Sequence, residues 1–157
     1  MSEREVTVGV ISDTHGLLRP QAVAALRGSD LIIHAGDVGN REVITTLSGI
    51  APTFAVRGNI DKAAWAAELP MTKLVEVGER LFCVLHEISQ LDLDPATAGF
   101  AAVVFGHSHQ PWIETRDGVL FLNPGSAGPR RFKLPIAVAR VAVSGGQLRP
   151  EIVELEV

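Results

Sequence analysis

The sequence predicts a single α/β domain with mixed β-sheets, extending over residues 1–157. In its first half, short apolar runs rich in β-branched residues alternate with helical segments, an order that favours parallel strands joined by right-handed crossovers. In its second half, apolar runs come in pairs around tight turns, which is typical of antiparallel hairpins. A length of 157 residues with 46 % hydrophobic residues suits one domain with its own core.

Three buried strands and two helices are predicted in the first half. The strands are the apolar runs at residues 6–12, 30–34 and 53–56. The first helix, at residues 20–26, is rich in alanine, and the second covers residues 41–47. Asn40 is a suitable N-cap for the second helix, and Gly49 is a stop signal after it.

Three hairpins, one further buried strand and one helix are predicted in the second half. The hairpins pair residues 72–77 with 80–85 around Gly78, 112–115 with 119–122 around Gly118, and 136–143 with 147–155 around Gly145. The further strand lies at residues 102–105, and the helix is expected near residues 91–98.

Composition narrows the class of protein. The net charge is −4 without any block of like charge, so a basic nucleic-acid-binding face is not expected. No run approaches the ~20 apolar residues of a membrane span, and the charged residues 1–5 do not fit a signal peptide. Cys83 lies within an apolar run, as a buried structural thiol would. A soluble, cytoplasmic protein is expected, and a homo-oligomer is compatible with this composition.

Metal-capable side chains follow five of the apolar runs, each at the point where the run ends. They are Asp13 with His15, Asp37, Asn59, His86, and His107 with His109. Sites in α/β sheets form beyond the carboxyl ends of the strands, so we expect these residues to converge. Gly36, Gly58 and Gly106 directly precede three of them, and glycine lets other groups approach the backbone closely.

The donor types predict a centre of two transition-metal ions. Two carboxylates, one amide and four imidazoles suit Mn, Fe, Co, Ni or Zn better than Mg or Ca. Seven donors are too many for one four-coordinate ion but suit two ions that share a carboxylate. With a bridging hydroxide, such a centre keeps a charge of about +1, attracts phosphate and activates a water for in-line attack.

Simpler interpretations exist for single residues. A lone Asp or His after a strand is usually a cap or a solvated loop residue, and only the joint pattern favours a metal centre. The fifth histidine, His34, lies inside a predicted strand, so we interpret it as a core or supporting residue.

The motifs resemble those of the calcineurin-like metallophosphoesterases, and the small size resembles the compact phosphodiesterase branch related to vacuolar protein sorting 29. The resemblance rests on Asp13-Thr-His15-Gly, Gly36-Asp37, Gly58-Asn59, His86, Gly106-His107-Ser-His109 and Asn123-Pro-Gly-Ser126. It extends from about residue 6 to about residue 131 and implies a four-layer α/β/β/α sandwich.

The resemblance also implies roles for the ligands. A first metal position would be held by Asp13, His15, Asp37 and His109, and a second by Asp37, Asn59, His86 and His107, with Asp37 bridging. Asp37, Asn59, His86 and His107 would thereby form the catalytic set. Asn59 and Asn123 would lie beside the phosphate. Arg57 and Arg130 are further candidates for phosphate contacts, with plain surface charge as the alternative.

Two positions depart from the family pattern. Many relatives carry His or Cys after the Gly-Asn motif, where this chain has Ile60, which can donate no proton to a leaving group. We therefore expect a preference for esters with good leaving groups. Relatives commonly have Gly after the ligand His86, where this chain has Glu87. A carboxylate beside an anion site repels substrate unless it is paired, so Glu87→Gly should change substrate range or affinity.

Several functions compete. The favoured one is hydrolysis of small phosphodiesters, with a phosphomonoesterase as its closest chemical rival. A non-catalytic protein-binding scaffold is the rival of a different class, and the complete ligand set argues against it. A repair nuclease is disfavoured by the acidic composition.

Overall fold

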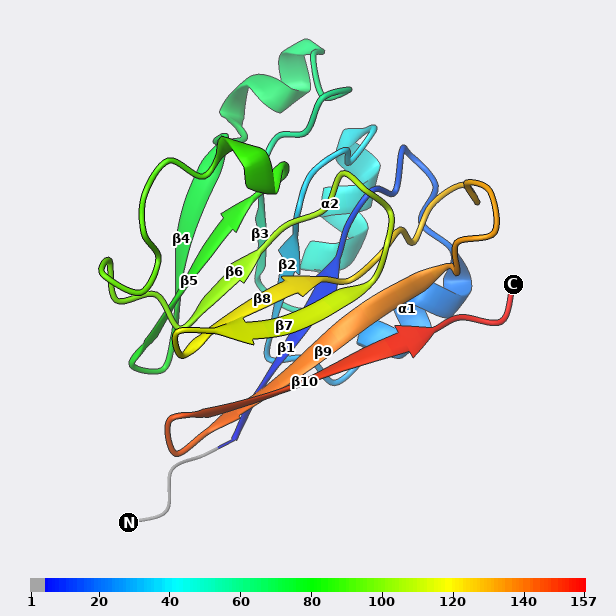
Figure 1. The fold of residues 1–157 in the computed structure, drawn as a ribbon. Coiled ribbons are helices and arrows are strands. Elements are labelled where there is room, and N and C mark those ends of the chain that lie inside the picture. Colours follow the sequence, from blue (N-terminus) through cyan, green and yellow to red (C-terminus); the bar gives the residue numbers. More distant parts are fainter. Residues whose placement is uncertain (1–4) are drawn as a thin grey trace.

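Two five-stranded sheets face each other in the computed structural model, which describes residues 5–157 (Figure 1). The first sheet has the order β10(Gln147–Glu154), β9(Ala137–Ser144), β1(Val6–Ile11), β2(Leu31–His34), β3(Thr53–Ala55). The second has the order β4(Thr72–Val77), β5(Arg80–Leu85), β6(Ala102–Val104), β8(Val119–Asn123), β7(Trp112–Arg116). Both sheets are mixed, as the sequence predicts.

The parallel pairs bring the ends of the ligand-bearing strands together. In the first sheet β1, β2 and β3 are parallel neighbours, with Ile11 beside His34 and His34 beside Ala55. In the second sheet β5, β6 and β8 run parallel. The three predicted hairpins are present, as the antiparallel pairs β4–β5, β7–β8 and β9–β10.

The last hairpin returns to the start of the chain. Strand β9 pairs antiparallel with β1, from Val6 opposite Val143 to Val10 opposite Ala139. The C-terminal hairpin therefore completes the N-terminal sheet, a long-range pairing that local sequence patterns do not indicate.

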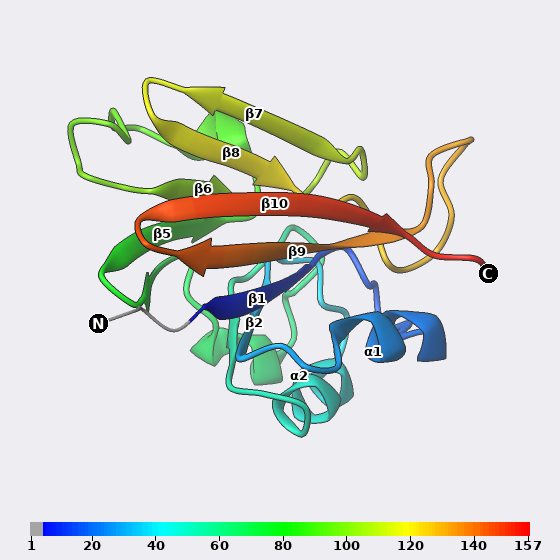
Figure 2. The same cartoon turned by 90° about the horizontal axis from the view of Figure 1, so that it is seen from below.

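Helices cover the outer face of the first sheet (Figure 2). They are α1(Pro20–Leu26) and α2(Arg41–Ser48). As predicted, the Asn40 side chain caps α2 by accepting from the Val43 amide, and Gly49 ends the helix. Leu26 and Leu47 pack with Ile32 of the sheet in one apolar cluster, which explains why these faces are buried.

A separate core lies between the sheets. Its centre includes Val10 and Ile33 from the first sheet, and Phe82, Val104 and Leu122 from the second. Because both faces of these central strands are buried, their sequences are continuous apolar runs.

The predicted helix at residues 91–98 is wrong. This segment holds a single turn, in which the Ala98 amide donates to the Asp94 carbonyl and the Asp94 side chain accepts from the Ala96 amide. Pro95 lacks an amide hydrogen, and Gly99 has a φ of 80°, so the turn does not extend into a helix.

The fourth layer of the sandwich is thin as a result. It consists of the short 3₁₀-helix η2(Ile88–Gln90) and the turn after it, which cover the outer face of the second sheet through Ile88, Leu91 and Phe100. Buried Cys83 belongs to this cluster, and burial raises the pKa of its thiol, in agreement with a structural role. A second 3₁₀-helix, η1(Ala64–Glu68), follows β3.

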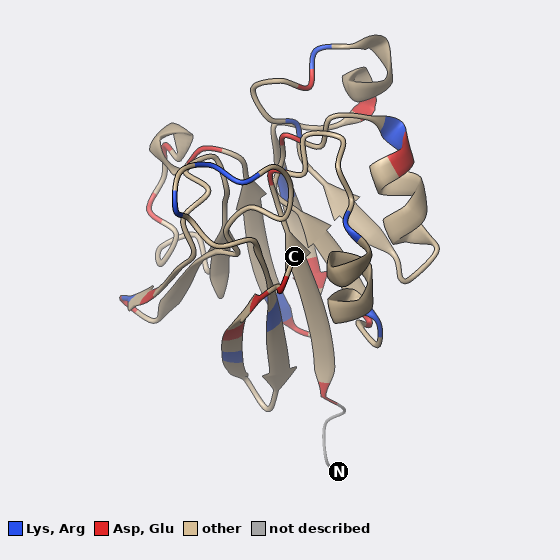
Figure 3. Ribbon diagram, turned by 90° about the vertical axis from the view of Figure 1, so that its right-hand side faces the viewer, with Lys and Arg blue, Asp and Glu red and all other residues tan. Residues whose placement is uncertain are grey.

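Positive and negative residues are mixed along the chain, as its small net charge of −4 suggests. In Figure 3, Lys and Arg segments are interspersed with Asp and Glu segments over the side of the ribbon that faces the viewer. Among the described residues, none of the helices has the length and apolar character needed to cross a bilayer. Residues 1–4, on which the expectation of no signal peptide partly rests, lie outside the described part of the chain.

Candidate metal centre

The predicted ligands lie in loops at the carboxyl ends of strands from both sheets. Asp13, Asp37 and Asn59 lie in the loops after β1, β2 and β3, whereas His86 follows β5 and His107 follows β6. The site therefore lies where the carboxyl ends of two sets of parallel strands meet (Figure 1). His15 and His109 lie two residues beyond Asp13 and His107 in the same loops.

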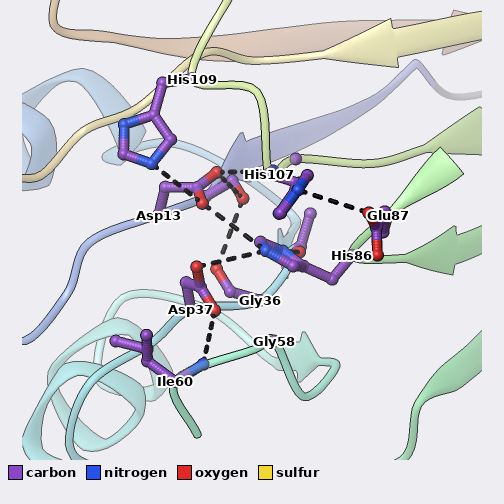
Figure 4. A network of polar contacts seen from close by, with 12 residues as sticks. Asp13, Gly36, Asp37, Gly58, Ile60, His86, Glu87, His107 and His109 are labelled. Atoms are coloured by element: carbon purple, nitrogen blue, oxygen red, sulfur yellow. Dashed lines mark hydrogen bonds and ion pairs between the residues drawn. The ribbon is translucent and has the colours of Figure 1, made fainter. Parts of the chain in front are cut away.

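Five of the seven predicted ligands form one buried or half-buried cluster (Figure 4). The Nε2 atom of His109 is 3.4 Å from Oδ1 of Asp13, and His86 Nε2 is 3.8 Å from the same oxygen. Oδ2 of Asp37 lies 3.3 Å from His86 Nε2 and 3.5 Å from His15 Nε2. Asp37 thus reaches a ligand of each expected metal position, and so does Asp13.

One polar atom of each central residue is held by the protein, and a second atom points into the cluster. Asp13 Oδ2 accepts from the Ser12 hydroxyl at 2.7 Å and from the His107 amide, while its Oδ1 faces the imidazoles. Asp37 Oδ1 accepts from the Ile60 amide at 3.1 Å, which leaves Oδ2 to face His15 and His86.

His86 follows the same pattern. Its Nδ1 donates to the Ala35 carbonyl at 2.7 Å, which fixes the ring and leaves Nε2, facing the carboxylates, as the atom that can bind a metal. Metal-binding histidines are commonly oriented in this way.

Four buried atoms of these ligands have no hydrogen-bond partner. Asp13 Oδ1, His15 Nε2 and His86 Nε2 face the cluster, whereas His109 Nδ1 lies on the far side of the ring from the Nε2 that faces Asp13 (Figure 4). A buried polar atom without a partner costs about 1–3 kcal/mol, so such atoms rarely gather in one place without a ligand. All four belong to residues that can bind transition metals. The donor set therefore fits the metal that the sequence predicts.

Charge within the cluster favours the ionised form of Asp37. The pKa of Asp37 is lowered to about 2: burial alone would raise it, but the contacts with His86, the Ile60 amide and His15 outweigh burial. The pKa of His86 is raised, because its contacts with Asp37 and Asp13 outweigh the opposing effect of burial.

The ligand loops also hold strained backbone. Five of the seven non-glycine residues with positive φ in the described chain are predicted ligands, namely Asp13, His15, Asp37, His107 and His109, at 49° to 74°. Such conformations cost of order 1 kcal/mol each and gather at functional sites. The loops turn sharply at these points and direct the side chains inward.

Glycines allow the loops to pack against each other. A Cβ on Gly58 would lie 2.2 Å from both the amide nitrogen and Oδ1 of Asp37, and one on Gly106 would lie 2.7 Å from Asp13 Oδ2. One on Gly36 would lie 2.6 Å from His86 Nδ1. The predicted need for close approach is confirmed at all three.

Two buried residues support the centre from behind. His34 Nδ1 accepts from the Gly36 amide at 3.1 Å, and its Nε2 donates to the Thr14 hydroxyl at 3.0 Å, because that hydroxyl is itself a donor to Val38. Burial lowers the pKa of His34 to about 4, so the ring is neutral. This agrees with the predicted supporting role.

Asp61 is the second supporting residue, and the sequence reading missed it. It is 1 % exposed, and its carboxylate accepts from the amides of Val38, Gly39 and Gly58 at 2.9–3.0 Å. It thereby ties the Asp37 loop to the Asn59 loop. Its position two residues after Asn59 was the available signal.

Asn59 and His107 lie at the open side of the cluster. Both are exposed, and the His107 ring meets the His86 ring edge-on at 5.3 Å. Asn59 lines a cavity of about 420 Å³ with Arg57, His86 and Glu87. Arg57 and the ligand His86 therefore line the same cavity.

The other two predicted substrate contacts are placed differently. Asn123 is fully buried, and its amide donates to the Gly106 carbonyl and the Ser108 hydroxyl while accepting from Gly125. These hydrogen bonds anchor the loop between His107 and His109. Arg130 is exposed and donates to the Leu134 carbonyl within its own loop.

The motifs, the fold and the cluster match a known class. The model of the calcineurin-like phosphoesterase superfamily domain matches residues 6–146. The chain belongs to this superfamily of metal-dependent phosphoesterases. A probable metallophosphoesterase of Methanothermobacter thermautotrophicus is 34 % identical, over 93 % of this chain and 91 % of its own.

Solved structures share the fold. An archaeal phosphodiesterase superposes with a TM-score of 0.79 at 22 % identity, over 94 % of this chain and all of its own. Vps29 of Entamoeba histolytica in complex with Zn²⁺ superposes with a TM-score of 0.68 at 19 % identity, over 95 % of this chain and 99 % of its own.

Proposed function

We propose that this chain hydrolyses small phosphodiesters at a centre of two divalent transition-metal ions. The observation that carries the proposal is the convergence of three unpartnered, buried atoms at the carboxyl ends of strands from both sheets: Asp13 Oδ1, His15 Nε2 and His86 Nε2. Manganese is our preferred ion, with iron, nickel, cobalt and zinc as alternatives that the same donors accept. When bound, two ions would supply Lewis acidity to the phosphoryl oxygens and activate a water for in-line attack.

The residues divide the remaining work. Asp13, His15, Asp37 and His109 would hold the first ion, and Asp37, Asn59, His86 and His107 the second. Exposed Asn59 and half-buried Arg57 line the cavity beside His86, where they can donate to phosphate oxygens. This role is kept for Arg57, whereas Asn123 acts by holding the loop and Arg130 is left as surface charge.

Residue 60 cannot protonate the leaving group. The Ile60 side chain is 46 % exposed and carries no proton, while its amide is engaged by Asp37. We therefore expect faster turnover of aryl or cyclic phosphodiesters than of simple alkyl diesters. Equal rates and identical pH profiles for aryl and alkyl diesters would contradict this expectation.

Metal analysis followed by a phosphoester panel tests the function. The purified protein should bind about two equivalents of Mn²⁺ and hydrolyse bis(p-nitrophenyl) phosphate faster than p-nitrophenyl phosphate. Asp37→Ala and His107→Ala should each lower kcat/KM at least ~10³-fold without loss of fold by circular dichroism. Asp92→Ala, at an exposed position in the turn after η2, is the matched control and should retain activity.

Two alternatives would produce different results. A phosphomonoesterase would reverse the order of the two nitrophenyl substrates. A protein-binding scaffold would show no turnover with any of the five metals; the fold it shares with Vps29 motivates this alternative. All seven ligand positions here carry competent side chains, which supports the enzyme.

A further inference from the structure

The spacing of several donor atoms in the centre suits ligands that share one metal ion. Two donors at ~2.1 Å from one tetrahedral ion are about 3.4 Å apart. The His109–Asp13 and His86–Asp37 pairs have this spacing, at 3.4 Å and 3.3 Å. Both distances exceed the usual 2.7–3.2 Å of an N–H···O hydrogen bond.

Glu87 forms a third pair with the same spacing, outside this cluster. Its Oε1 is 3.4 Å from Nε2 of His107, the atom with which His107 would bind a metal (Figure 4). The side chains of His107 and Glu87 are 43 % and 35 % exposed, so both can adjust to an ion.

The surroundings place Glu87 on the side of the second metal position. It directly follows His86, whose ring meets that of His107, and it lines the same cavity as Asn59. Of the three ligands proposed for that position alone, His86 and His107 are immediate neighbours of this carboxylate, and Asn59 lines the same cavity. A carboxylate so close to a dication gains attraction that exposure to solvent only partly screens.

We propose that Glu87 is a further ligand of the second metal position. The inference depends on the proposed two-metal centre. A third carboxylate lowers the net charge of the centre from about +1 to about zero and adds a third oxygen donor to two oxygens and two nitrogens. It therefore favours Mn²⁺ over softer ions at that position, and a carboxylate that binds an ion repels a substrate less than a free one does.

Calorimetric titration with Mn²⁺ alone tests this role without any substrate. Wild-type protein should bind two equivalents, and in Glu87→Gln the second should bind at least tenfold more weakly while the first is unchanged. Glu79→Gln, in the turn at the other end of β5, is the matched control and should bind like wild type. Thermal melts with a chelator verify that the variants fold.

A double variant tests whether Glu87 and His107 act on the same ion. Glu87→Gln should weaken the second equivalent by much less in a His107→Ala background than in wild type, because the two side chains share that ion. Unchanged or tighter second binding in Glu87→Gln would overturn the inference, since Glu87 would then only restrain His107. Failure of wild-type protein to bind two ions would overturn the proposed function itself.

Discussion

At the scale of single residues, the centre is oriented before any ion binds. Asp13, Asp37 and His86 each commit one atom to a protein hydrogen bond and turn another toward the cluster. This arrangement limits the rotamers available to each ligand, so less conformational freedom is lost when a metal binds. His34 and Asp61 extend this restraint to the loop backbones.

The neutral state of His34 predicts a pH-dependent stability. Its pKa is about 4 in the folded chain, whereas an unfolded histidine has a pKa near 6.5. Between these values the unfolded chain takes up a proton that the folded chain does not, so stability falls as the pH drops. Between pH 7 and pH 5, this residue should lower the free energy of unfolding by roughly 2 kcal/mol.

His34→Gln isolates this contribution, because glutamine does not titrate and its amide can donate to Thr14. Urea unfolding of both proteins at pH 7 and pH 5, with a chelator present, should show a smaller loss for the variant. Equal losses in the two proteins would contradict the assigned pKa shift.

At the scale of elements, the site depends on glycines in the loops that follow short strands. Gly58 and Gly106 each precede a ligand in such a loop and lie against a carboxylate ligand from another loop. The close packing of these loops therefore depends on the missing side chains of the glycines as well as on the ligand residues.

Gly58→Ala tests this close approach. The added methyl would overlap Asp37, so we expect a loss of about 1–3 kcal/mol of stability and at least tenfold weaker metal binding. Gly49→Ala is the matched control, because that residue has an ordinary φ of −72° and its Cβ would lie 3.3 Å from its nearest neighbour, the Thr46 carbonyl. Denaturation and Mn²⁺ titration measure both effects, and equal behaviour of the variants would refute the explanation.

Sequence patterns predicted every strand to within about one residue, because buried strands here are continuous apolar runs with clear turn residues. They failed at residues 91–98, where Asp94 and Pro95 form a local turn. They also missed Asp61, because its partners are backbone amides, which the sequence does not identify, and its place two residues after Asn59 was the only signal. The pairing of β9 with β1 depends on long-range geometry in the same way.

At the scale of the whole molecule, the centre joins two sheets that otherwise meet through apolar packing. Asp13, His15 and Asp37 come from the first sheet, and His86 and His109 from the second. Any ion bound among them links the two sheets directly. We therefore expect metal binding to stabilise the whole folded chain in addition to its role in catalysis.

Added metal should raise the free energy of unfolding. At a concentration 100 times Kd, one bound ion contributes about 2.7 kcal/mol if the unfolded chain does not bind it. Urea unfolding with Mn²⁺ and with a chelator should show this difference in wild type and little of it in Asp37→Ala. A metal-independent midpoint in the wild-type protein would count against a site that spans both sheets.

Because five predicted ligands have a left-handed backbone conformation, the requirements of the metal site oppose those of folding stability. Glycine at Asp13, Asp37 or His109 would relieve the backbone at that point and remove a donor at the same time. Substitutions of this kind would raise the free energy of unfolding and abolish metal binding, so they are favourable only where the reaction is not needed. The ligand loops thus sacrifice backbone stability for metal donors, and a chain of this fold that binds no metal would be free of that conflict.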